Sequence, residues 1–136
     1  MPSNRSQAVV LLIEDHAKTC EAYAGYLRWA GFTVVPTRTA VDAVRCFDEN
    51  PPDVVMLDMS FREGEGEREL LEQITARSLA THVPVLLMTS RDLGAKPRGT
   101  RVVLRKPVAP EALLAAVQRF SKGRSRRPHP RPAEGS

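Results

Sequence analysis

The chain has 136 residues, 42% of them hydrophobic, and a net charge of +4 from 20 basic and 16 acidic side chains. This length suits one compact domain, and the composition excludes collagen-like, coiled-coil and wholly disordered chains. The longest apolar run, residues 8–13, is far too short to span a bilayer, and the first residues lack the apolar stretch of a secretory signal. We therefore expect a cytoplasmic protein without a membrane partner, whose two cysteines, Cys20 and Cys46, stay reduced.

Five apolar runs rich in β-branched residues predict strands, at residues 8–13, 32–35, 54–57, 83–88 and 102–104. Apolar residues at three- and four-residue spacing predict helices after most of them, the last with Pro110 in its first turn. Residues 90–99 hold two glycines and a proline, so we expect a single turn or an irregular loop there. The alternation predicts an α/β fold with a doubly wound, five-stranded parallel sheet, flavodoxin-like, with about five helices of which the fourth is shortened.

The positive charge is concentrated at the end of the chain. Residues 121–136 hold five basic residues and one acidic residue, which leaves residues 1–120 neutral. This segment has three prolines and no aromatic residue, so we predict a disordered basic tail after a domain at residues 7–120 and a short arm at residues 1–6. Without aromatic side chains for base stacking, the tail would attract nucleic acid only through weak electrostatics, and we do not expect nucleic acid as a partner.

Polar side chains directly follow four of the five predicted strands: Glu14 and Asp15, Asp58, Thr89 and Ser90, and Lys106. The carboxyl ends of parallel strands share one edge of the sheet, so these side chains are expected to meet there. Three neighbouring carboxylates repel one another unless a cation lies among them, and hard oxygen ligands suit Mg²⁺. An aspartate in such a site can attack a phosphoryl group whose other oxygens a lysine and a hydroxyl would bind.

On these residues the sequence resembles the receiver domain of two-component response regulators, over about residues 7–120. The family's acid pair matches Glu14-Asp15, its phosphoacceptor matches Asp58, its switch hydroxyl matches Thr89 and its lysine matches Lys106. The resemblance implies Mg²⁺-dependent transfer of a phosphoryl group to Asp58 from a sensor histidine kinase or phosphotransfer protein. It implies a signalling domain and no enzyme beyond its own phosphorylation and autodephosphorylation, acting by contact with a downstream protein that the sequence does not identify.

The resemblance also implies two backbone features. The carbonyl of Ser60 would join Glu14, Asp15 and Asp58 as a metal ligand. The peptide between Lys106 and Pro107 would be cis, as a proline allows.

Several positions depart from the family pattern. Arg62 stands where the family has proline, and Val103 stands where the family has an aromatic switch residue. The segment from Thr89 to Lys106 is about five residues shorter than is usual in the family. These departures leave a phosphorylation-independent interaction module open. A phosphohydrolase would need an acid where Ser60 stands, and a nucleotide binder would need a glycine-rich loop after the first strand. No DNA-binding pattern follows residue 120, so we expect a stand-alone receiver.

Overall fold

The computed structural model describes residues 7–59 and 65–125. Its elements, in chain order, are β1 (Val9–Ile13), α1 (Ala17–Trp29), β2 (Thr33–Thr37), α2 (Ala40–Glu49), β3 (Val54–Met59), α3 (Glu65–Thr81), β4 (Val85–Thr89), β5 (Thr100–Arg105) and α4 (Pro110–Ser125). All neighbouring strands are parallel, in the order β2-β1-β3-β4-β5. The predicted five-stranded parallel sheet is therefore confirmed, and the described residues form four helices in place of the expected five or so.

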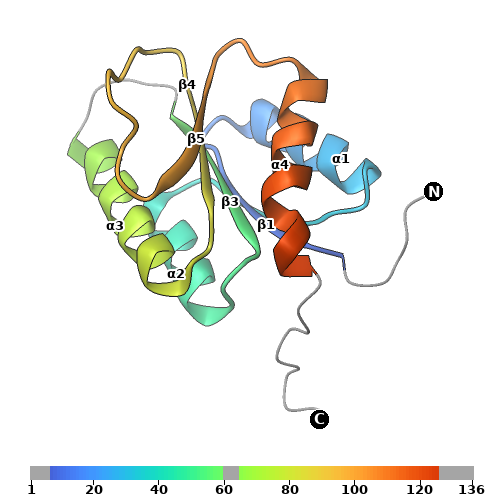
Figure 1. Ribbon diagram of the computed structural model, residues 1–136, viewed down its shortest axis with the longest axis horizontal. Coiled ribbons are helices and arrows are strands. Elements are labelled where there is room, and N and C mark those ends of the chain that lie inside the picture. The colour runs from blue at the N-terminus through green and yellow to red at the C-terminus, as the bar shows by residue number, and fades with distance from the viewer. Residues whose placement is uncertain (1–6, 60–64, 126–136) are drawn as a thin grey trace.

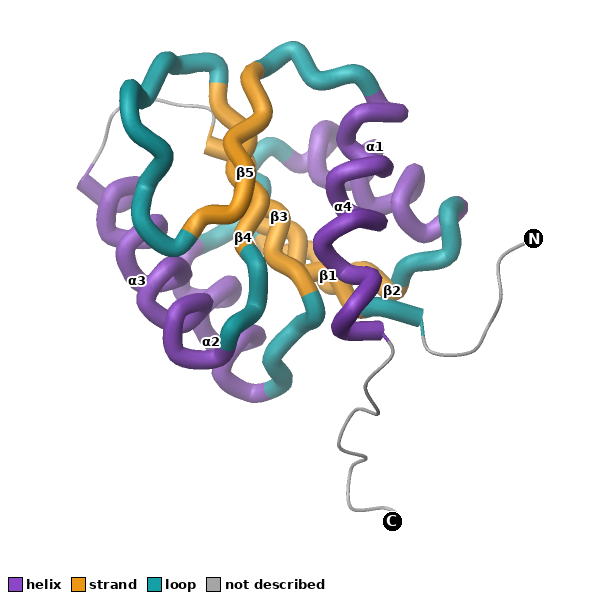
Figure 2. Tube along the Cα trace, viewed as in Figure 1, coloured by secondary structure: helices purple, strands orange, loops and turns teal. Residues whose placement is uncertain are grey.

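Helices cover both faces of the sheet, α1 and α4 on one and α2 and α3 on the other (Figures 1 and 2). Successive strand residues point to opposite faces, so each strand contributes to both cores. In β1, Val10 and Leu12 pack with the α1–α4 core, while Leu11 and Ile13 pack with the α2–α3 core. Strands buried on both faces explain the nearly continuous apolar runs in the sequence.

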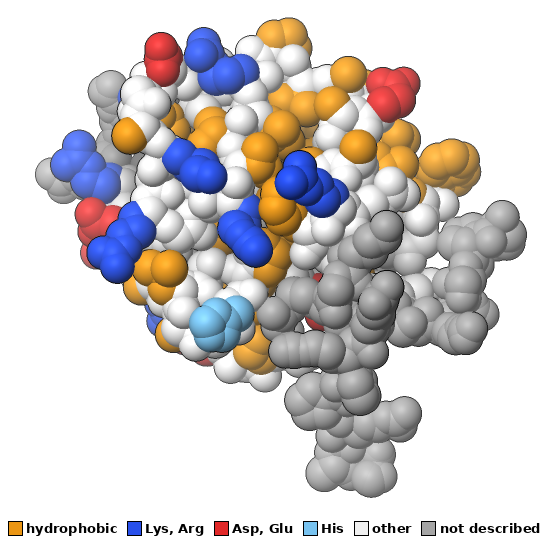
Figure 3. All heavy atoms as spheres, viewed as in Figure 1, with side chains coloured by type: hydrophobic (Ala, Val, Ile, Leu, Met, Phe, Trp, Pro, Cys, Tyr) orange, Lys and Arg blue, Asp and Glu red, His pale blue; other side chains and the backbone are white. Residues whose placement is uncertain are grey.

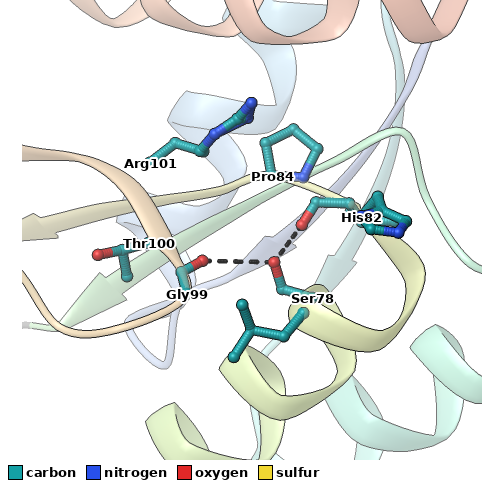
Figure 4. Close-up of a pocket in the computed structure, with 8 residues that line it drawn as sticks. Ser78, His82, Pro84, Gly99, Thr100 and Arg101 are labelled. Atoms are coloured by element: carbon teal, nitrogen blue, oxygen red, sulfur yellow. Dashed lines mark hydrogen bonds between the residues drawn. The ribbon is translucent and has the colours of Figure 1, made fainter.

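The connection from β4 to β5, residues 90–99, is an irregular loop with no helix. The shortened fourth helix is thus absent altogether, and the expected irregular loop is present. Gly99 has φ +93°, and a Cβ there would lie 2.8 Å from Thr75 Cβ on α3. Beside this contact the Ser78 hydroxyl donates to the carbonyls of Val83 and Gly99, the latter at 3.3 Å (Figure 4). The loop therefore packs directly on α3, at the amino ends of β4 and β5.

The last helix is longer than the sequence predicted. It continues to Ser125, five residues past the expected boundary at residue 120. Ser121 is 3% exposed and extends the buried stripe of Leu113 and Val117 by one more turn. The helix therefore includes residues 121–125, which the sequence interpretation placed in the tail, and residues 126–136 and the arm at residues 1–6 lie outside the described residues. Within residues 7–59 and 65–125, no helix has the length and apolar character of a membrane span.

Candidate functional site

The predicted polar residues meet at the carboxyl edge of the sheet. Asp58 is in β3, opposite Met88 of β4, and Thr89 closes β4 one residue further along. Glu14 directly follows β1, which is the other neighbour of β3. Lys106 directly follows β5, and its backbone N–H donates to the carbonyl of Thr89 at 2.9 Å. Strand order alone thus brings these four residues to one place.

The centre of the site is an ion pair between Asp58 and Lys106. The Asp58 side chain is fully buried, and Lys106 Nζ lies 2.5 Å from its Oδ1. The second oxygen, Oδ2, is also buried, and no described residue forms a hydrogen bond with it. The Lys106–Pro107 peptide is cis, as predicted. A buried carboxylate with one oxygen held and the other unsatisfied is energetically costly, which is typical of a position kept for chemistry.

Glu14 lies beside Asp58 and is almost completely buried, with 2% of its surface exposed. Its Oε2 accepts from the His16 backbone N–H at 2.8 Å, while its Oε1 is buried without a hydrogen-bond partner. Burial, with the adjacent Asp58 as a further cause, raises the pKa of Glu14 to about 8, and Lys106 opposes this shift. Charged forms of two adjacent buried acids are disfavoured unless a cation joins them.

Thr37 is a supporting residue that the sequence interpretation missed. It ends β2 and is buried, and its hydroxyl donates to the carbonyl of Leu12 at 3.0 Å. Its own carbonyl accepts from the Glu14 backbone N–H at 3.0 Å. These two bonds fix the end of β1 and so orient Glu14. The signal in the sequence was a polar residue two positions after the second apolar run.

The second member of the acid pair behaves differently from the first. Asp15 is exposed, and among the described residues no three Asp, Glu, His or Cys side chains lie close enough to hold a metal ion together. Within the described residues Asp15 is not brought together with Glu14 and Asp58, and its role as a metal ligand stays a prediction. Ser60, the fourth expected ligand, lies outside the described residues.

Two buried carboxylate oxygens nevertheless suit a hard cation. When both acids are ionised, Glu14 Oε1 and Asp58 Oδ2 are removed from water and receive no hydrogen bond from any other described residue. The one ammonium group at the site, from Lys106, is paired with the other Asp58 oxygen. The donor set fits Mg²⁺, which needs few protein oxygens and retains water molecules in its remaining positions.

Thr89 supplies a hydroxyl at the same edge. It is 2% exposed, and its Oγ1 accepts from the Arg91 backbone N–H at 3.1 Å, so the hydroxyl hydrogen can still be donated. The Arg91 side chain is exposed beside it. Val103, where an aromatic switch residue was expected by resemblance, is half-buried on β5 and packs in the same core cluster as Leu93 of the loop. Arg62 lies outside the described residues.

Known proteins have sequences similar to that of this chain. The family model for the response regulator receiver domain matches residues 10–118. Protein PilH of Pseudomonas aeruginosa is 26% identical over 121 residues, which cover 85% of this chain and 99% of that protein. The swarming motility regulation protein RssB of Serratia marcescens is 26% identical over 118 residues, covering 83% and 52%. The chain thus spans about half the length of several curated relatives that it matches.

Solved structures show the same fold. A response regulator receiver domain protein from Clostridium thermocellum has 24% identity and a TM-score of 0.73, covering 86% of this chain and 96% of that one. The chemotaxis protein CheY4 of Vibrio cholerae has 23% identity and a TM-score of 0.71, covering 84% and 98%. Because the family match runs from β1 into α4 and includes the whole carboxyl edge, the chain belongs to the response regulator receiver domain family.

Proposed function

We propose that Asp58 accepts a phosphoryl group from a sensor histidine kinase or phosphotransfer protein, in a Mg²⁺-dependent reaction, and that the phosphorylated domain signals by protein contact. One observation carries this proposal. The Asp58 carboxylate is fully buried at the carboxyl edge of the sheet, with Lys106 Nζ 2.5 Å from one oxygen and no hydrogen-bond partner on the other among residues 7–59 and 65–125. A purely structural aspartate at this depth would have both oxygens satisfied.

For phosphoryl transfer to Asp58 the protein needs mainly to position the reacting groups and to offset their charge. An Asp58 oxygen attacks phosphorus, an O–P bond forms, and the bond from phosphorus to the donor nitrogen breaks with its electron pair on that nitrogen. The Lys106 ammonium offsets the negative charge that gathers on the phosphoryl oxygens, and the Thr89 hydroxyl donates a hydrogen bond to one of them. Hydrolysis of the acyl phosphate by water would return Asp58 to its starting state.

The proposed metal site uses Glu14 and Asp58, whose free oxygens are described above, with Asp15 and the Ser60 carbonyl as further proposed ligands. Glu14 and Asp58 carry two negative charges when ionised, and Lys106 supplies one positive charge, so these three groups favour an additional cation. When bound, Mg²⁺ supplies charge neutralisation to the transferring oxygens. The residues of this chain hold the ion and orient the carboxylate.

The test is the mass of the intact protein after incubation with acetyl phosphate and Mg²⁺. We expect the mass of one phosphoryl group to be added, lost in Asp58→Asn and on chelation with EDTA. Asp48→Asn is the matched control, because Asp48 is an exposed carboxylate on α2, away from the sheet edge. A wild-type protein that stays unmodified at saturating donor, or an Asp58→Asn variant modified as fully as the wild type, would refute the proposal.

The second candidate is a receiver-like interaction module that works without phosphorylation. The helix-free loop between β4 and β5 and the small Val103 favour it, because both remove parts on which the resemblance would base a conformational switch. An unmodified wild-type protein in the same experiment would select this candidate. The proposed cytoplasmic location applies to both candidates, and both cysteines are free.

A further inference from the structure

Residues 1–120 have no net charge, but their acidic and basic residues are concentrated in different parts of the chain. Residues 1–89 hold eight basic and thirteen acidic residues, whereas residues 90–120 hold seven basic and two acidic residues. Six of the seven basic side chains are exposed: Arg91, Lys96, Arg98, Arg101, Arg105 and Arg119. Lys and Arg side chains accordingly gather over β5 and the loop before it (Figure 3).

Four of them surround a hollow of about 350 Å³ along the edge of the sheet. It is lined by Arg91, Lys96, Arg101, Arg105 and Val103, which we call the basic edge surface, and also by one acidic residue, Asp92. Among the described residues, Lys96, Arg101 and Arg105 form no ion pair, whereas Arg45 and Arg77 on the helices α2 and α3 are paired with acids. With four basic residues and one acidic residue around the hollow, the surface carries a net positive charge.

The hollow borders an open strand. β5 is the last strand of the sheet, so one side of its backbone faces away from β4. The Lys106 N–H points to β4, where it bonds the Thr89 carbonyl. Because backbone groups alternate along a strand, those of Val103 and Arg105 point outward. One outward carbonyl, that of Arg101, accepts from Lys96 Nζ at 3.1 Å, in place of a strand partner.

We propose that the basic edge surface binds an extended acidic polypeptide segment, which adds to β5 as a sixth strand. Outward N–H and C=O groups on β5 fix the peptide backbone, as in other complexes formed by strand addition. The surrounding arginines and Lys96 select acidic side chains, and the half-buried Val103 accepts an apolar residue between them. This binding does not depend on phosphorylation of Asp58.

The surface suits a peptide better than a nucleic acid. The open edge of β5 presents backbone N–H donors and C=O acceptors alternately. A peptide backbone can pair with both, whereas the phosphates of a nucleic acid can pair only with the donors. Phe120, an aromatic ring beside this surface, has Arg101 and Arg119 guanidinium carbons at 5.6 and 5.0 Å from its centroid. The ring is therefore occupied by cations and is not a platform on which a base can stack.

The probe is a fluorescein-labelled peptide of alternating glutamate and valine, titrated with the unphosphorylated full chain and followed by fluorescence anisotropy. We expect saturable binding that weakens as NaCl is raised, and a loss of at least about tenfold in affinity in Arg101→Glu/Arg105→Glu. The matched control is Lys18→Glu/Arg38→Glu, which changes the charge equally at exposed residues outside this surface. Circular dichroism checks that both variants stay folded.

Two further probes separate charge from strand addition without altering the protein. The same peptide with alternate backbone nitrogens methylated keeps its charge but cannot pair on that side, so we expect it to bind at least about tenfold more weakly. Equal binding of the methylated peptide overturns the strand-addition proposal. Tighter binding of a DNA duplex at the same ionic strength, an equal loss in the control variant, or no binding of the peptide also overturns it.

Discussion

Replacing Gly99 by alanine is expected to destabilise the domain strongly, because two independent costs coincide there. The residue has φ +93°, which costs an L-residue about 1–2 kcal/mol. The new Cβ would also lie 2.8 Å from Thr75 Cβ and 3.1 Å from the Thr75 carbonyl oxygen, an overlap with α3 that costs about 1–3 kcal/mol. Alanine also makes the unfolded chain less flexible, which stabilises the folded protein by about 0.4–1 kcal/mol. We expect a net loss of about 1–5 kcal/mol in the free energy of unfolding.

Two other glycines separate these costs. Gly94 has φ +73° but open space around it, so Gly94→Ala measures the backbone cost alone and should lose at most about 1.5 kcal/mol. Gly25 lies inside α1 with open space and an ordinary φ, so Gly25→Ala should gain up to about 1 kcal/mol. Urea denaturation of the three variants provides the comparison. If Gly99→Ala loses no more than Gly94→Ala, the close approach of the loop to α3 is refuted.

Three further predictions concern other parts of the domain. Thr39→Ala removes the N-cap of α2 and should cost about 1 kcal/mol in urea denaturation, while an unchanged midpoint would contradict the cap. Arg77 lowers the pKa of Asp48 through its hydrogen bonds, so the wild-type protein should be slightly more stable than the Arg77→Met variant at neutral pH. This advantage should fade as acid protonates Asp48 in thermal melts, and an advantage that persists in acid would refute this pairing. The exposed Arg91 follows Thr89 by two residues, and we expect it to shield a phosphoryl group on Asp58 from water, so Arg91→Ala should speed loss of phosphate several-fold; an unchanged decay of the phosphorylated mass would refute this role.

The sequence predicted the strands and the order of the site residues, because apolar runs and the polar residues after them are local features. It could not predict which member of the Glu14-Asp15 pair faces Asp58, since this depends on how β1 ends against Thr37 of a neighbouring strand. The extension of α4 was hidden by Ser121, a polar residue on a buried stripe.

The charge separation was present in the sequence, but its consequence depends on topology. In the order β2-β1-β3-β4-β5, the last strand of the chain is also an edge of the sheet, so the basic residues 90–105 lie together along an open side. Both ends of this segment lie at the carboxyl edge of the sheet, because Thr89 precedes the segment and Lys106 follows it. The Lys106 backbone N–H donates to the Thr89 carbonyl and so joins the two ends. With no helix between β4 and β5, the basic edge surface is joined to the residues around Asp58 by one continuous stretch of loop and strand. The proposed phosphorylation site around Asp58 and the proposed peptide-binding surface therefore adjoin each other where Thr89 and Lys106 are joined by their backbone hydrogen bond.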